Sequence, residues 1–181
     1  QINGSAFYGC SNLKQVNANK ESLYLSSSNG VLYNKSKTTL VVYPAGIKED
    51  TYDFPNTVNK LGVYSFVFSN IKTIDLKNVT YIDDYTFTYS KINNVVISDK
   101  VTYLGKGAFL YSNISDITLG HGLTELSTEC FKSTELLNEI INSVGVTLTD
   151  YASLEIYLAD CNTKTTEIDN YIKIATIYQL C

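Results

Sequence analysis

The feature that most constrains the fold of this chain is a phrase of about 22 residues that recurs along it. Two successive copies read VTYIDDYTFTYSKINNVVISDK from Val79 and VTYLGKGAFLYSNISDITLGHG from Val101. Four copies carry a phenylalanine in the same slot, and these are Phe66, Phe87, Phe109 and Phe131. A unit of this size cannot bury its apolar side chains alone, so the copies are expected to stack on one another.

Each copy also repeats two apolar patterns around its phenylalanine. An apolar pair spaced by three residues opens the copy, as in Val79 and Ile82, and an I-x-x-I-x-L pattern follows, as in Ile92, Val95 and Ile97. We expect the second pattern to form a short strand that pairs in parallel with the same strand of the next copy, roughly 4.8 Å away. The stacking of the copies predicts a β-rich solenoid with a buried column of phenylalanines.

The N-terminal part of the chain combines one further copy with an insertion. INGSAFYGCSNLKQVNA places Phe7 in the phenylalanine slot and Leu13, Val16 and Ala18 in the strand slots. LYLSSSNGVLYNKSKTTLVVYPAG then holds Asn29-Gly30 and a polar NKSK break between β-rich runs, which predicts a β-hairpin or short meander inserted at about residues 21–57. Its strongest strand is expected over residues 40–43, where Pro44 ends the pairing.

These residues carry a resemblance to a known family. The pattern V-x-x-I-G-x-x-A-F-x-x-C/S-x-x-I-x-x-I-x-L, matched best from Val101 to Leu119, resembles the BspA-like leucine-rich repeats, and NGVLYNKSKTTLVVYPAG resembles an insertion of the same family. The resemblance implies a leucine-rich-repeat solenoid over residues 1–134. It also implies a microbial protein that is secreted or exposed at the cell surface, in a family associated with adhesion, with no catalytic residues to transfer.

A different pattern begins after Glu135. TELLNEIINSV, TDYASLEIYLAD and TTEIDNYIKIATIYQL each start with a threonine able to cap a helix, so residues 135–181 are expected to form a helical C-terminal cap. The alternative is a strand, because IKIATIY is rich in β-branched residues.

Composition disfavours two classes of partner. The chain carries 14 lysines and no arginine against 18 carboxylates, a formal net charge of −4, which disfavours nucleic-acid binding. No apolar run is long enough to cross a bilayer, so no membrane insertion is expected in this segment. The chain opens within a repeat, so we interpret it as a fragment or mature region, whose destination the absence of a signal peptide does not decide.

The cysteines and the single histidine favour structural roles. Cys10 and Cys130 occupy repeat slots and are expected to be buried core thiols. Cys161 and Cys181 lie outside the repeats, so we expect these two to form the one disulfide. No C-x-x-C spacing is present, so neither a metal site nor a cofactor is expected. His121 lies in a Gly-flanked turn, and the adjacent pair Asp83-Asp84 should diverge, so the sequence indicates no enzyme.

The remaining candidates lie on the surface. On an I-x-x-I-x-L strand the intervening side chains point away from the core, so they should form one polar face, for which Gln15, Asn17, Thr73, Asp75, Asn94, Val96, Asp116 and Thr118 are the candidates. Phe68, Tyr89 and Tyr111 stand two residues after the phenylalanine slots, and Tyr81 and Tyr103 form a second series. These rings could form an exposed aromatic strip or could half-bury as packing between copies.

The sequence therefore predicts non-catalytic recognition of a protein, such as an extracellular-matrix or host-cell protein, through the polar strand face with Tyr89 and Tyr111 beside it. The alternative is a structural spacer or stalk that projects another domain.

Overall fold

The computed structural model describes residues 2–120, 122–123, 125–126 and 130–131. A 3-10 turn, η1 (Gly4–Phe7), is followed by ten strands in two sheets. The larger sheet has the order β1-β2-β3-β4-β6-β8-β10, and the smaller has the order β5-β7-β9. The strands are β1 (Leu25–Ser28), β2 (Val31–Asn34), β3 (Thr39–Val42), β4 (Lys60–Leu61), β5 (Thr73–Ile74), β6 (Tyr81–Ile82), β7 (Asn94–Ile97), β8 (Tyr103–Leu104), β9 (Asp116–Leu119) and β10 (Glu125–Leu126).

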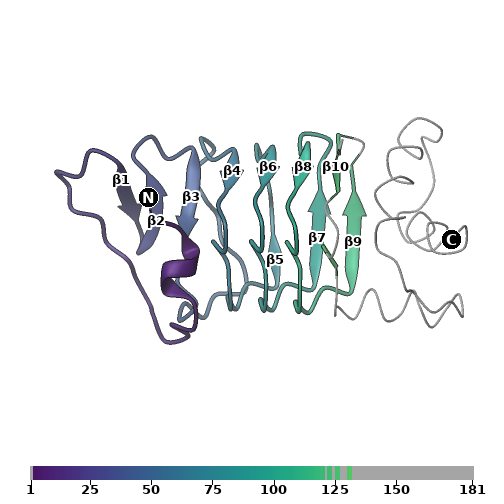
Figure 1. Cartoon of the computed structure of the whole chain (residues 1–181), viewed down its shortest axis with the longest axis horizontal. Coiled ribbons are helices and arrows are strands. Elements are labelled where there is room, and N and C mark those ends of the chain that lie inside the picture. The colour runs from purple at the N-terminus through teal and green to yellow at the C-terminus, as the bar shows by residue number, and fades with distance from the viewer. Residues whose placement is uncertain (1, 121, 124, 127–129, 132–181) are drawn as a thin grey trace, which may run out of the picture.

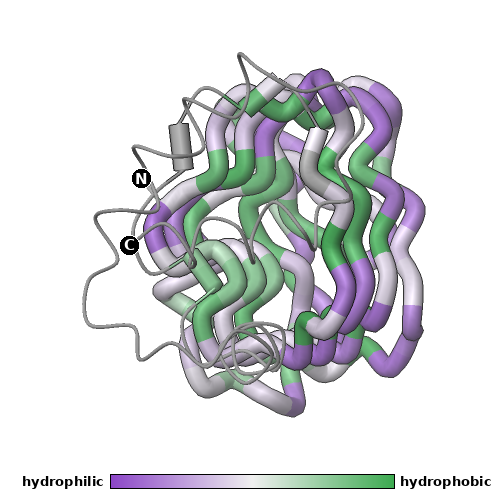
Figure 2. Tube along the Cα trace, turned by 90° about the vertical axis from the view of Figure 1, so that its right-hand side faces the viewer, coloured by the Kyte–Doolittle hydropathy of each residue, from purple (hydrophilic) through white to green (hydrophobic). Residues whose placement is uncertain are grey.

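The copies that begin at Val58, Val79 and Val101 each give one strand to each sheet, and successive copies pair in parallel (Figure 1). In the smaller sheet Thr73 lies opposite Asn94, and Asn94 lies opposite Asp116. In the larger sheet Tyr81 lies opposite Tyr103. The same slot of each copy therefore lies beside its equivalent in the next, as expected. Figure 2 shows the result, with apolar and polar bands running side by side across successive turns of the chain.

The interior is organised around a column of aromatic rings, the phenylalanine column. Phe87 stacks between Phe66 and Phe109 with ring centroids 5.1 and 5.2 Å away, and it is fully buried. Its backbone N–H donates to the carbonyl of Ala108, and equivalent bonds connect the other copies. Packing and backbone hydrogen bonds thus fix the same register.

The inserted hairpin is present and lies at one end of the larger sheet. β1 and β2 pair antiparallel around Asn29 and Gly30, which both have positive φ, as a two-residue type I′ turn requires. β3 then pairs antiparallel with β2 but parallel with β4. The hairpin therefore joins the repeats through a change of strand direction within a single sheet.

Phe7 does not lie in the phenylalanine column, where its slot in the repeat predicted it. Tyr43, not Phe7, stacks on Phe66, at 5.0 Å, and the Tyr43 N–H donates to Ser65 O just as the Phe66 N–H donates to Thr86 O. Phe7 packs with Val16 and Ala18 against a second apolar cluster on the hairpin. The physical reason is the backbone register, because the segment that follows β3 continues the inter-repeat hydrogen bonds.

Those bonds extend through residues 38–54. The carbonyl of Thr38 accepts from Asn59 N–H, as the carbonyl of Asn59 accepts from Thr80 N–H. The carbonyl of Asp50 accepts from Lys72 N–H in the same way. This segment, predicted as part of the insertion, lies next to the copy that begins at Val58. Gln15 and Asn17 consequently lie outside the smaller sheet.

The two described cysteines differ in exposure. Cys130 is buried as expected, whereas Cys10 is exposed, so the expectation of a buried Cys10 was wrong. Phe7 lies outside the phenylalanine column. Cys10, which follows Phe7 as Ser90 follows Phe87, therefore does not take the buried position that Ser90 takes. The expected cap at 135–181, the Cys161–Cys181 disulfide and His121 lie outside the described residues. Within the described residues, no helix is long and apolar enough to span a membrane.

Candidate recognition surface

The smaller sheet presents a continuous outer face, called here the strand face. Its members are the exposed side chains Thr73, Asp75, Asn94, Val96, Asp116 and Thr118. β7 alternates exposed and buried residues, because successive side chains of a strand point to opposite sides. The structure thus places all six residues predicted for this face together. Gln15 and Asn17, expected there too, do not join it.

Neighbouring copies are connected across this face. Asn94 Nδ2 donates to Asp116 Oδ2 at 2.9 Å, so a polar pair spans β7 and β9. Val96 stands on the same strand with 56% of its surface exposed, the one large apolar side chain on the face. An exposed apolar residue with a polar rim is the arrangement that protein interfaces use at their centre.

A groove of about 510 Å³ opens at the β5 end of the strand face. Thr73, Asp75 and Val96, three of the predicted residues, line it together with Thr51, Tyr52, Asp53, Ile74, Leu76, Lys77 and Ser98. Lys77 forms an ion pair with Asp53 and also donates to the carbonyl of Phe54. The groove therefore runs from residues 51–53 across residues 73–77 to Val96 and Ser98 of the next copy.

Sequence reasoning missed the wall of the groove formed by residues 51–53. A signal for it exists, because Tyr52 and Phe54 precede Ile74 and Leu76 by 22 residues each, which is the repeat spacing. The match is obscured because an aromatic pair replaces the aliphatic pair of the other copies.

A second surface lies on the turns between the two sheets. Phe68, Tyr89 and Tyr111, called here the tyrosine column, stack at 5.0 and 4.9 Å with nearly parallel rings. Tyr89 is 40% exposed and Tyr111 45%, so these rings both pack on one another and face solvent. Desolvation, followed by the neighbouring Tyr8 and Tyr111, raises the pKa of the Tyr89 phenol. Both interpretations that the sequence left open are therefore realised in part.

The tyrosine column has unusual backbone geometry. Phe68, Tyr89 and Tyr111 have φ between 54 and 56°, as do Tyr64 and Tyr85 in the neighbouring stack. This left-handed region costs a bulky residue about 1–2 kcal/mol, so the stacking must offset it. At the N-terminal end, Tyr8 contacts Tyr64 and Phe68 edge-on, at 5.9 and 5.1 Å.

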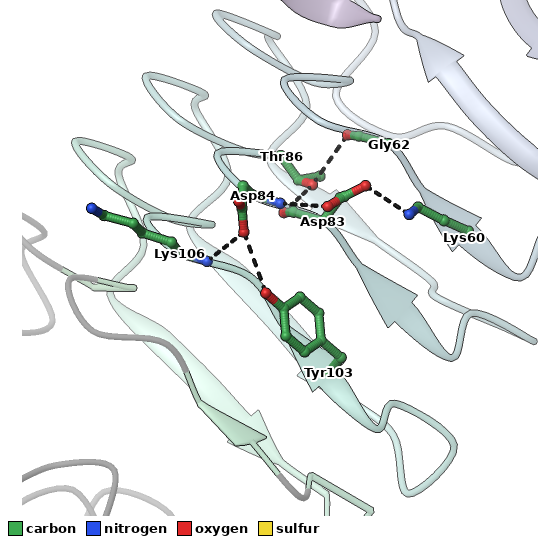
Figure 3. Close-up of polar contacts among 7 residues, drawn as sticks. All are labelled: Lys60, Gly62, Asp83, Asp84, Thr86, Tyr103 and Lys106. Carbon is green, nitrogen blue, oxygen red and sulfur yellow. Dashed lines mark hydrogen bonds and ion pairs between the residues drawn. The ribbon is translucent and has the colours of Figure 1, made fainter.

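The outer side of the larger sheet carries a polar network (Figure 3). Lys60 pairs with Asp83 at 2.8 Å and lies over the Tyr81 ring, which stacks on Tyr103 at 4.3 Å. Asp84 accepts from the Tyr103 hydroxyl and from the backbone N–H of Lys106. The two adjacent carboxylates thus have separate partners, as expected from their divergence.

This network shifts the pKa of a tyrosine. Burial, and then the charge of Asp84, raises the pKa of Tyr103 to about 12, so the phenol stays protonated at neutral pH. Burial also raises the pKa of the Cys130 thiol far above its ordinary range. Among the described residues, no group of three or more His, Cys, Asp or Glu side chains could hold a metal ion.

Comparison with known proteins identifies the repeat. A family model described as the BspA type leucine-rich repeat region matches residues 1–52 and 47–158, in six copies. No curated protein matches the chain.

Two solved structures share the fold. A leucine-rich repeat protein from Eubacterium ventriosum aligns with a TM-score of 0.54 at 22% identity, over 69% of this chain and 47% of that one. The pneumococcal vaccine antigen PcpA aligns with a TM-score of 0.53 at 22% identity, over 67% of this chain and 36% of that one. The chain thus spans less than half the length of either protein, and identity this low establishes the fold alone.

Proposed function

Because this chain belongs to the BspA-type leucine-rich-repeat family, we propose that it forms a solenoid that recognises a protein partner without catalysis, at the cell surface or after secretion. The observation that carries the proposal is the strand face. Parallel pairing repeats exposed polar side chains at fixed intervals across three copies, with Val96 and the groove at one end. A rigid array of this kind presents side chains with little loss of conformational entropy on binding.

Adhesion to extracellular-matrix or host-cell proteins is the specific form of this function that the family favours. The strand face supports a protein as the ligand because it is broad, polar and lined by side chains from three different copies. The described part of the chain offers no cluster for metal-assisted chemistry, and Asp83 and Asp84 are engaged by Lys60 and Tyr103.

The test is a surface-plasmon or pull-down measurement against extracellular-matrix and host-cell proteins. Changing Thr73, Asn94 and Asp116 together to lysine places a new cation on each copy of the strand face and should abolish binding. The matched control changes Asn59, Thr80 and Thr102 to lysine, because these exposed residues repeat in the same way beside the larger sheet.

Each outcome separates the alternatives. Loss of binding in the strand-face variant but not in the control supports recognition through this face. Equal binding by both variants means that the site is wrong. If the unchanged protein binds none of these partners, the spacer or stalk function is favoured instead.

A further inference from the structure

The smaller sheet opens on one side of β7 but not on the other. β7 and β9 pair through four positions, up to Ile97 and Leu119, whereas β5 and β7 pair only at two, ending at Ile74 and Val95. The groove lies where the pairing stops, and Val96 and Ser98 line it from β7. The chain therefore leaves an incomplete sheet next to the most exposed apolar side chain of the strand face.

The opposite side of β5 is also incomplete. Thr73 N–H donates to the carbonyl of Asp50, which begins a parallel ladder with the preceding segment. Within the described part of the chain, no hydrogen bond continues that ladder from residues 51–53 to the Thr73 carbonyl, and the Asp75 N–H has no acceptor. A strand that offers unpaired N–H and C=O groups is a template for a further strand.

The walls of the groove indicate which side chains would suit it. Val96 supplies exposed apolar surface between polar residues, and the buried Ile74 and Leu76 lie beneath the groove. Asp53 is already paired with Lys77, but Asp75 accepts only from the Lys77 backbone N–H, so its carboxylate has no cation beside it among the described residues. The chain as a whole carries a net charge of −4. Charge complementarity therefore favours a basic ligand.

We propose that the groove binds an extended segment of a partner protein that adds backbone hydrogen bonds at β5 and places a lysine or arginine beside Asp75. A long apolar side chain of the segment extends over β5 to Val96, while its backbone meets the Thr73 carbonyl and the Asp75 N–H on the side that faces residues 51–53. This mode of recognition draws affinity from main-chain bonds and selectivity from alternate side chains. The inference deepens the proposed function, since it names the partner chemistry at one end of the strand face.

A phage-displayed library of random dodecapeptides, panned against the whole chain, supplies the probe. The peptides recovered should be enriched in basic residues and apolar β-formers, and synthetic versions should bind the chain. Val96→Arg should weaken that binding at least about tenfold, because it places bulk and a cation in the lining of the groove. Thr118→Arg is the matched control, since Thr118 is the neighbour of Val96 on β9 and lies outside the groove.

Two further measurements isolate the backbone and the charge. Methylation of single peptide nitrogens should abolish binding at alternate positions, because alternate N–H groups of a strand point to the same side. Asp75→Asn, which preserves shape, should weaken binding about three- to tenfold at low salt and remove most of its salt dependence. Hydrogen exchange at the Asp75 amide should slow when the peptide binds.

The inference is overturned if no peptide is recovered, if the peptides bind Val96→Arg as well as the unchanged chain, or if methylation shows no alternation. None of these outcomes decides whether changing Thr73, Asn94 and Asp116 to lysine abolishes the binding of a whole partner protein. The strand-face function and the groove inference can therefore fail separately. Peptides without basic residues would likewise contradict the role given to Asp75.

Discussion

Replacing Phe87 by alanine removes the ring at the centre of the phenylalanine column. The side chain is fully buried and stacks on both Phe66 and Phe109. Burial of a phenylalanine contributes about 1.5–3 kcal/mol, and each aromatic pair adds about 0.5–1.5 kcal/mol. Together these contributions amount to about 2.5–6 kcal/mol. We therefore expect the variant to lose about 4 kcal/mol of unfolding free energy, within the range of about 3–5 kcal/mol for such truncations.

Tyr89→Ala is the matched control. Tyr89 also stacks on both sides, at 5.0 and 4.9 Å, but 40% of its surface is exposed. Tyr89→Ala should lose the two stacking contacts and leave little cavity, at a cost of about 1–3 kcal/mol. The difference between the two variants therefore measures burial and cavity formation, separated from stacking.

Urea unfolding followed by far-UV circular dichroism measures both variants. Comparison of the midpoints requires equal slopes against denaturant, since repeat arrays can lose two-state behaviour. A loss for Phe87→Ala no larger than that for Tyr89→Ala would refute the idea that neighbouring copies share one core through this column.

Three other variants or treatments test local features. Ser90→Ala should be neutral or stabilising by up to about 1 kcal/mol, because the buried Ser90 hydroxyl has no hydrogen-bond partner among the described residues. Ser26→Ala should instead cost about 1 kcal/mol, because the Ser26 hydroxyl donates a hydrogen bond. Urea unfolding measures both variants, and the reverse order of stability would contradict this expectation. Tyr103 has its pKa raised from 10.0 to about 12, so it contributes stability that is complete below pH 10 and lost as the pH rises through 12. Between pH 10 and pH 12, Tyr103→Phe should lose less unfolding free energy than the unchanged chain. Identical alkaline unfolding curves for the two proteins would exclude the effect. Cys161 and Cys181 are predicted to form a disulfide, so alkylation of the unreduced chain in denaturant should label two cysteines, and the mass of four labels would exclude it.

The strands of the smaller sheet could be predicted because their signal lies in the residues themselves. Ile92, Val95 and Ile97 have the spacing of a half-buried strand, and the same spacing recurs in neighbouring copies. The strands of the larger sheet between copies were not predicted, since each is two residues long, as at Tyr81–Ile82. So short a strand has no periodicity and is defined only by its neighbours.

The first ring of the phenylalanine column shows where sequence similarity misleads. Phe7 stands in the better repeat match, Ala6-Phe7-Tyr8-Gly9-Cys10, yet Tyr43 takes the position next to Phe66. The choice depends on the hydrogen bond from Tyr43 N–H to Ser65 O and on the path of β3, which no local pattern encodes. The groove could not be predicted for a similar reason, because it arises where pairing between β5 and β7 stops.

Parallel pairing between copies also has a mechanical consequence. The hydrogen bonds between neighbouring strands run along the axis of the stack, so a force that separates the ends of the described segment loads them in sequence and not all at once. Each copy that detaches releases a stretch such as Asn94 to Asp116, or roughly 75 Å of extended chain. Extension under load would therefore proceed in uniform steps, with the intact copies keeping their paired strands and their surface.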